Sequence, residues 1–126
     1  MTLTFDEAGD LLDAMAEEFP PAFFEELSGG INLLPELKRD PDYPDKLYLR
    51  GEYCNDELGK RINIFYGTFV QFSKEENWTE EDWTDELRTT LAHELTHHVE
   101  GRAGAYGLEV KDAAFMEQFR KDIGEK

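Results

Sequence analysis

Two histidines and a glutamate within five residues are the clearest sign of chemistry in this chain. The segment reads His93-Glu94-Leu95-Thr96-His97, which is the spacing HExxH. Residues four apart lie one turn apart on the same face of a helix, so the two imidazoles can bind one Zn²⁺ while the Glu94 carboxylate reaches a water held on that metal. The pattern predicts a metal-dependent hydrolase with Glu94 as general base.

A third metal ligand has to come from outside this segment. Catalytic zinc usually has three protein ligands and a water molecule, and the remaining histidine, His98, is expected on a packed face of the helix. A carboxylate is therefore expected. Glu109 ranks first because it follows a turn and starts a returning helix. Glu100 ranks second, since it can ligate only if the helix bends or ends there. Asp112 ranks third, and it is better placed to orient a histidine ligand.

The sequence around the motif predicts a helix from about residue 80 to residue 100. Gly101 is expected to end this helix in a left-handed conformation. At about 100° per residue, a packed stripe forms on one side and the two motif histidines lie on another, with Glu94 between them. His98 falls on the packed side and is interpreted as a hydrogen-bonded core or supporting histidine. The packed stripe consists of Leu87, Leu91, Leu95 and Val99.

The rest of the chain predicts a small α+β domain over residues 1–126. Thr4 and Glu7 resemble a capping box for an N-terminal helix, and Pro21 is expected to open a short second helix that Gly29-Gly30 ends. Strands are expected over 31–37, 46–49 and 61–70, where Ile62, Ile64 and Tyr66 would share one face. Residues 51–56 are interpreted as turn-like, with Cys54 as an incidental thiol. The last predicted helix holds Leu108, Phe115, Met116, Phe119 and Ile123.

The charge and composition of the chain argue against some classes of binding partner. With 13 basic and 29 acidic residues, the net charge of −16 argues against binding nucleic acid or an anionic membrane. No signal peptide precedes the first helix, the apolar runs are too short to span a bilayer, and the single cysteine cannot form an internal disulfide. A cytoplasmic protein is expected. Because its surface is acidic, a basic protein is a candidate partner.

The overall pattern resembles the small bacterial zincin-like metallopeptidases, also called minimal zincins. The resemblance covers nearly the whole chain, and only HExxH is specific by itself. It implies a zinc-binding helix on a small mixed sheet, with His93 and His97 as ligands and Glu94 as general base. The segments that carry it are 47–53, 62–69, 93–100, Ala103-Gly104 and Leu108-Glu109.

The chain departs from one zincin pattern in which Gly and Asp follow HExxH at fixed spacing. Here these positions hold Glu100 and Ala103. Either another acid, with Glu109 preferred, replaces the missing ligand, or the site is incomplete and binds metal weakly.

The function predicted from these features is zinc-dependent hydrolysis of a peptide or protein substrate. The strand at 61–70 is the candidate to pair with an extended peptide by strand addition. Tyr66 and Tyr106 are candidates to stabilise the transition state, although core packing is the favoured role for each. The alternative function is a non-catalytic metal-binding or protein-interaction module on the same scaffold.

Overall fold

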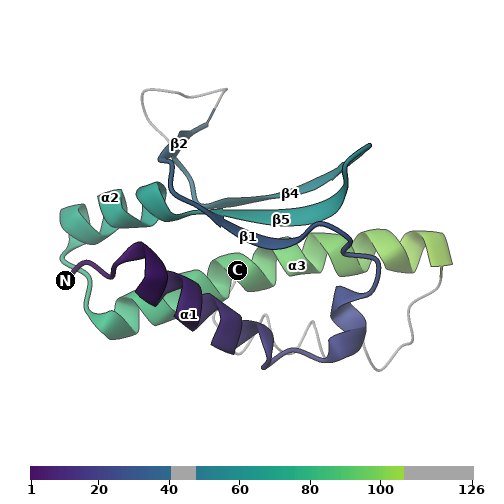
Figure 1. The fold of residues 1–126 in the computed structure, drawn as a ribbon, viewed down its shortest axis with the longest axis horizontal. Helices are drawn as coiled ribbons and strands as arrows, with labels where there is room; N and C mark the ends of the chain where they lie inside the picture. Colours follow the sequence, from purple (N-terminus) through teal and green to yellow (C-terminus); the bar gives the residue numbers. More distant parts are fainter. Residues whose placement is uncertain (41–47, 107–126) are drawn as a thin grey trace.

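A computed structural model describes residues 1–40 and 48–106, with side chains described as far as Gly101 (Figure 1). The predicted closing helix, Glu109 and Asp112 lie outside the described residues. The helices are α1 (Phe5–Ala16), the 3₁₀ helix η1 (Pro21–Phe24), α2 (Tyr66–Glu76) and α3 (Glu80–Tyr106). The strands are β1 (Gly30–Leu34), β2 (Lys38–Arg39), β3 (Tyr48–Leu49), β4 (Gly51–Asp56) and β5 (Gly59–Phe65).

The main sheet is mixed and has the strand order β1-β5-β4. The central strand, β5, runs parallel to β1 and antiparallel to β4. The helices α1 and α3 lie side by side under one face of this sheet, and α2 lies at one end of it (Figure 1). The predicted α+β class with a small mixed sheet packed against the motif helix is confirmed at this level.

Apolar side chains between the sheet and the helices form the core. Ile62 and Ile64 of β5 are fully buried against the stripe of α3, as the alternation in the sequence predicts. Both long helices begin at capping boxes, in which a threonine hydroxyl accepts a backbone N–H and an acidic side chain returns the bond. The two boxes are Thr4 with Glu7 and Thr79 with Asp82.

The predicted strand at 61–70 is wrong in its second half, because β5 ends at Phe65 and α2 begins at Tyr66. The run of aromatic residues here also has spacings of three and four, which suit one face of a helix. Gly67 therefore lies inside a helix instead of ending a strand. A Cβ atom at Gly67 would stand 2.5 Å from the Leu37 backbone nitrogen, so this position needs glycine for close backbone approach.

Residues 51–56, predicted to be turn-like, form the strand β4. The turn signals in Asn55-Asp56 belong to the end of this strand and to the hairpin that comes after it. Gly59 closes that hairpin with a φ of 104°, and the Asp56 carboxylate accepts hydrogen bonds from Leu58 N and Arg61. The sequence correctly indicated a turn in this region, but the turn follows β4 instead of replacing it.

Two other predicted segments are shorter than expected. The second helix is the four-residue η1, because Glu26 has a left-handed φ of 66° that a continuing helix cannot include. The strand β1 ends at Leu34, since Pro35 has no N–H to donate to a sheet.

The helix α3 does not stop at Gly101 and continues to Tyr106. Gly101 has no positive φ, which a left-handed stop would require. Glycine at the end of a helical pattern permits a stop but does not enforce one, because the outcome also depends on the residues beyond the glycine.

This continuation makes Gly101→Ala a direct test. In a helix, alanine is favoured over glycine, and no described atom lies within 4 Å of the new Cβ. We expect the substitution to raise the free energy of unfolding by about 0.5–1 kcal/mol, measured by urea denaturation. Gly67→Ala, which places a Cβ against backbone, should lower it by about 1–3 kcal/mol. Destabilisation by Gly101→Ala would indicate a left-handed residue at this position.

Candidate metal centre

The donor atoms of the HExxH segment converge on the surface of α3. His93 and His97 are exposed, while Glu94 is only 8% exposed. The donor atoms of these three residues lie within 4.8 Å of one another. The two rings are 4.7 Å apart at their centroids and 89° to each other, with Nε2 atoms 3.2 Å apart.

This separation matches the geometry of a shared metal ion. Zinc binds imidazole nitrogen at about 2.0–2.1 Å, and a tetrahedral angle then places two such nitrogens about 3.3 Å apart. The 3.2 Å between the Nε2 atoms of His93 and His97 is close to that value. The residues present therefore fit a zinc ion.

The division of α3 into a packed side and a donor side is confirmed. Thr96 lies inside the motif and is buried, and its hydroxyl donates to the Ala92 carbonyl at 2.6 Å. All four residues of the predicted stripe are at most 2% exposed, and His93 and His97 face outward. Burial of the stripe fixes the rotation of the helix about its axis, so it also fixes where the imidazoles point. The buried stripe residues are Leu87, Leu91, Leu95 and Val99.

His98 is the hydrogen-bonded core histidine that its place on the packed side predicts. It is 0% exposed, with Nε2 at 2.7 Å from the Glu25 carbonyl and Nδ1 at 2.9 Å from the Tyr53 hydroxyl. A carbonyl oxygen only accepts, so Nε2 carries the proton and Nδ1 accepts from Tyr53. This pair of bonds ties α3 to β4 and to the segment after η1, directly beside the candidate ligand His97.

Removing the Tyr53 hydroxyl should therefore weaken the fold. Tyr53→Phe removes the hydroxyl that bonds to the buried Nδ1 of His98, which should lower the free energy of unfolding by about 1–3 kcal/mol in urea denaturation. Tyr48→Phe is the matched control, because no hydrogen bond of the Tyr48 hydroxyl is found in the described part of the chain. Equal effects of the two substitutions would contradict a role for the Tyr53–His98 bond.

A groove of about 330 Å³ runs beside the donor atoms. One wall is the chain from β3 into β4, and the other is the middle of α3. Eight residues line it, namely Tyr48, Leu49, Arg50, Gly51, Thr89, Thr90, His93 and Glu94. Gly51, the first residue of β4, lines this groove, and β4 is an edge strand of the sheet.

This arrangement corrects the strand predicted to receive a peptide. The segment at 61–70 contains β5, which has β1 on one side and β4 on the other. Its backbone groups are therefore already paired, and strand addition requires an edge. The sequence could not show which strand lies at the edge of the sheet.

The remaining sequence-predicted site residues have different outcomes. Glu100 is exposed in α3. It was expected to ligate only if the helix bends or ends there, and α3 does not end there but continues to Tyr106. Among residues with described side chains, it is not in the converging donor group. Tyr106 is helical, but its side chain lies outside the described residues. Glu109 and Asp112 also remain predictions.

Tyr66 has the packing role that was favoured for it. Its hydroxyl donates to the Leu3 carbonyl at 2.5 Å, and its ring stacks on Trp83 at a centroid distance of 6.0 Å. Burial, and secondarily the charge of Glu7, raises the pKa of this phenol. Tyr66 therefore anchors the N-terminal segment.

Cys54 lies half-buried in β4 and does not have the properties of a nucleophile. Burial raises the pKa of its thiol, and the carboxylate of Glu52 raises it further. A raised pKa keeps the thiol protonated, and the thiolate is the reactive form. The interpretation as an incidental thiol is supported.

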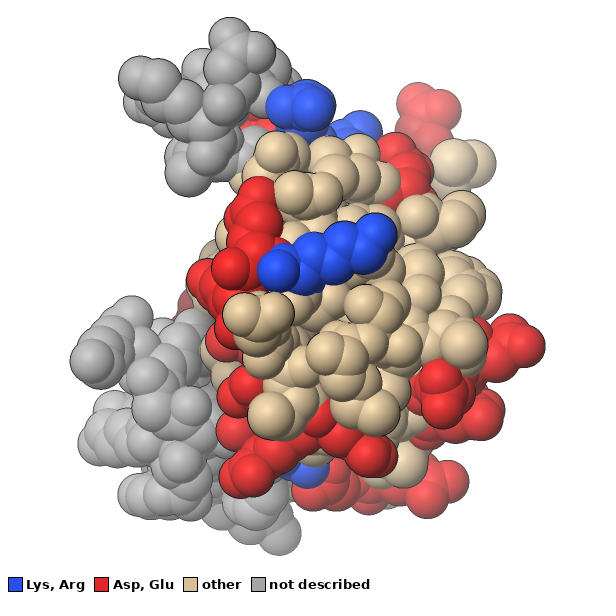
Figure 2. All heavy atoms as spheres, turned by 90° about the vertical axis from the view of Figure 1, so that its left-hand side faces the viewer, with Lys and Arg blue, Asp and Glu red and all other residues tan. Residues whose placement is uncertain are grey.

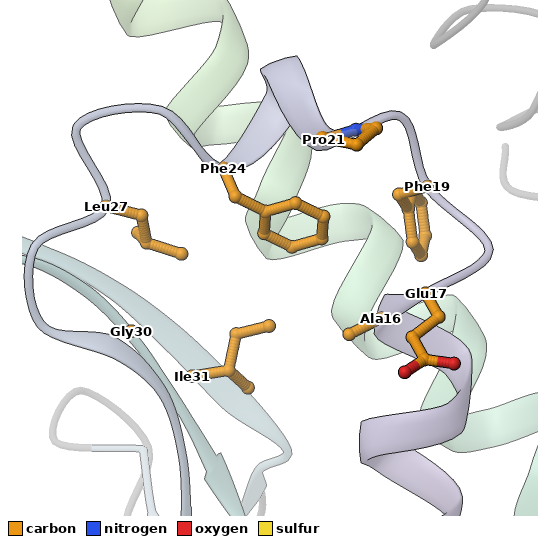
Figure 3. A pocket seen from close by; sticks show the side chains of 8 residues that line it. All are labelled: Ala16, Glu17, Phe19, Pro21, Phe24, Leu27, Gly30 and Ile31. Atoms are coloured by element: carbon orange, nitrogen blue, oxygen red, sulfur yellow. The ribbon is translucent and has the colours of Figure 1, made fainter.

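A second, larger hollow of about 460 Å³ lies away from the histidines. It lies between the end of α1, η1 and the start of β1, and mostly carbon atoms line it (Figure 3). Glu17 is the ionisable side chain among its lining residues, so this hollow offers no set of groups for catalysis.

Acidic side chains dominate the rim of the end of the molecule shown in Figure 2. This distribution agrees with the net charge of −16. In the part of the chain that the structure describes, no helix combines the length and apolar character needed to cross a membrane.

Comparison with known proteins supports the fold and names no activity. No family model matches the chain, and no protein in a curated set matches it significantly. Among solved structures, a conserved hypothetical protein from Thermus thermophilus is similar, with 29% sequence identity and a TM-score of 0.70. The match covers 81% of this chain and 99% of that one.

Proposed function

We propose that this protein is a zinc-dependent peptidase of the zincin-like type. The observation that carries the proposal is the 3.2 Å separation of the His93 and His97 Nε2 atoms, with the Glu94 carboxylate beside them on one helix. Structural zinc sites are usually closed by four protein ligands, whereas this donor group lies open beside a groove. An open site with an adjacent carboxylate suits hydrolysis.

In this proposal the chain supplies the proton transfers. A bound Zn²⁺ would supply a Lewis acid that lets water act as a nucleophile near neutral pH. Glu94 would take a proton from the attacking water on a carboxylate oxygen and deliver it to the leaving amine. The low exposure of Glu94 limits competition from bulk solvent for its oxygens. A carboxylate is the expected third ligand, and Glu109 remains the first choice.

The substrate is proposed to bind as an extended segment along β4. Phe65 N donates to the Arg50 carbonyl, and antiparallel pairing alternates, so the backbone groups of Gly51 point away from β5. Gly51 lines the groove together with His93. An extended peptide paired there would lie alongside the donor group. We further propose that the protein acts in the cytoplasm.

The test combines metal content with cleavage. We expect the purified protein to bind about one equivalent of Zn²⁺ by mass spectrometry of its metals, and the loaded protein to cleave members of a mixed peptide library. Stoichiometric zinc without cleavage of any peptide would favour the non-catalytic metal-binding module. Absence of zinc binding would overturn both.

The third ligand can be found by comparing three variants. Loss of zinc in only one of Glu109→Ala, Glu100→Ala and Asp112→Ala would identify it. Retention of zinc in all three would mean that the ligand lies elsewhere or that two histidines and water hold the ion.

A further inference from the structure

We propose that the groove beside His93 selects peptides that carry a carboxylate close to the cleaved bond, and that Arg50 binds this carboxylate. The inference rests on the proposed function, because it takes the groove as the substrate site. Its starting point is that Arg50 lines the same groove as His93 and Glu94.

The guanidinium of Arg50 lies over the ring of Phe72. It lies 4.6 Å from the centre of the Phe72 ring, a cation–π contact, and its side chain is 37% exposed. The contact with the ring restricts the guanidinium, and because Nε is buried, the N–H donors left for a ligand are those of the two terminal nitrogens. Arg50 is therefore oriented before any substrate arrives.

The hydrogen-bonding capacity of this group is poorly used in the protein itself. Its ion pair with Glu86 has an N–O distance of 3.4 Å, longer than the 2.7–2.9 Å typical of a charge-assisted hydrogen bond. Its Nε is buried and has no hydrogen-bond partner within the described residues. A guanidinium has five N–H donors in a fork that matches a carboxylate. A ligand carboxylate that meets the terminal nitrogens at about 2.7–2.9 Å can therefore bind better than Glu86 does.

The charge of the groove supports a local preference of this kind. Of the eight described lining residues, Arg50 alone carries a permanent positive charge, and Glu94 is the one carboxylate. The net charge of −16 would by itself favour basic peptides at every position. A preference for Asp or Glu at one position would be opposite to the preference that the net charge favours. Such a preference would therefore be evidence that Arg50 binds the carboxylate.

The experiment measures binding to the zinc-loaded Glu94→Gln protein, which should not cleave its ligand. Fluorescent peptides differ by Asp against Asn at each position in turn, and by a free or amidated C-terminus. We expect one of these exchanges to weaken binding about tenfold or more, as for loss of a hydrogen bond between charged groups. An effect of a side-chain exchange identifies an acidic residue, and an effect of amidation identifies the peptide C-terminus.

The variants separate Arg50 from general charge. Arg50→Gln should remove the preference, Arg50→Lys should keep part of it, and Arg50→Glu should reverse it toward Lys. Arg88→Gln makes the same change of charge on α3 but outside the groove, where Arg88 pairs with Glu18, and should leave the preference intact. Urea denaturation of each variant checks that the fold persists after the Phe72 contact is changed.

Two results would overturn the inference. One is equal binding of acidic and amide peptides at every position, and the other is an equal loss of preference in Arg50→Gln and Arg88→Gln. Failure of the proposed function would be seen separately, as absence of cleavage by the zinc-loaded wild-type protein. A carboxylate preference that depends on Arg50 would stand even in that case.

Discussion

Replacing Glu94 by glutamine is expected to lower peptide hydrolysis by about 10²–10⁴-fold while zinc remains bound. Glutamine has nearly the volume of glutamate, so the side chain can keep its position beside His93 and His97 at 8% exposure. It lacks a carboxylate to accept the proton of water. The measurement is kcat/KM of the zinc-loaded variant on a fluorogenic peptide that the wild type cleaves, with metal content determined on the same sample.

The matched control for this result is Glu81→Gln. Glu81 is exposed in the first turn of α3, far along the helix from the motif, and its replacement changes the net charge by the same amount. Its activity should stay within about twofold of wild type, as expected for an exposed side chain away from the groove. Hydrolysis at the wild-type rate by zinc-loaded Glu94→Gln would exclude Glu94 as the base.

Zinc is expected to stabilise the fold strongly, and the effect should depend on both motif histidines. A ligand present at about 1,000 times its Kd adds about 4 kcal/mol to the free energy of unfolding. For a domain of this size, that corresponds to a rise in Tm of roughly 10 °C or more. His93→Ala and His97→Ala should each lose most of this rise. Differential scanning calorimetry with added zinc or with a chelator measures it.

Two further variants test whether the loss of zinc stabilisation is specific to the metal ligands. Glu81→Gln should keep the full rise in Tm, since it leaves every donor of the group in place. Glu94→Gln should also keep most of it if Glu94 acts only on water. A loss in Glu94→Gln as large as that in His97→Ala would instead identify Glu94 as a metal ligand. Undiminished stabilisation in both histidine variants would rule out this metal centre.

The sequence by itself determined the features that depend on neighbouring residues along one helix or strand. The capping box of Thr4 and Glu7 starts α1 because both partners lie within one turn. The spacing of four between His93 and His97 brings their Nε2 atoms to 3.2 Å for the same reason. The burial of His98 followed from its angular position on α3.

Tertiary structure alone decided the features that depend on which segments meet. The aromatic run after Phe65 suits a strand or a helix, and packing against the chain at Leu37 accompanies the helical outcome. The residues from Gly51 to Asp56 became an edge strand by pairing with β5, and this places Gly51 at the groove. No local pattern placed Arg50 over Phe72 or Tyr53 against His98. These contacts join residues far apart in the chain, so they exist only after the sheet and α3 have packed together.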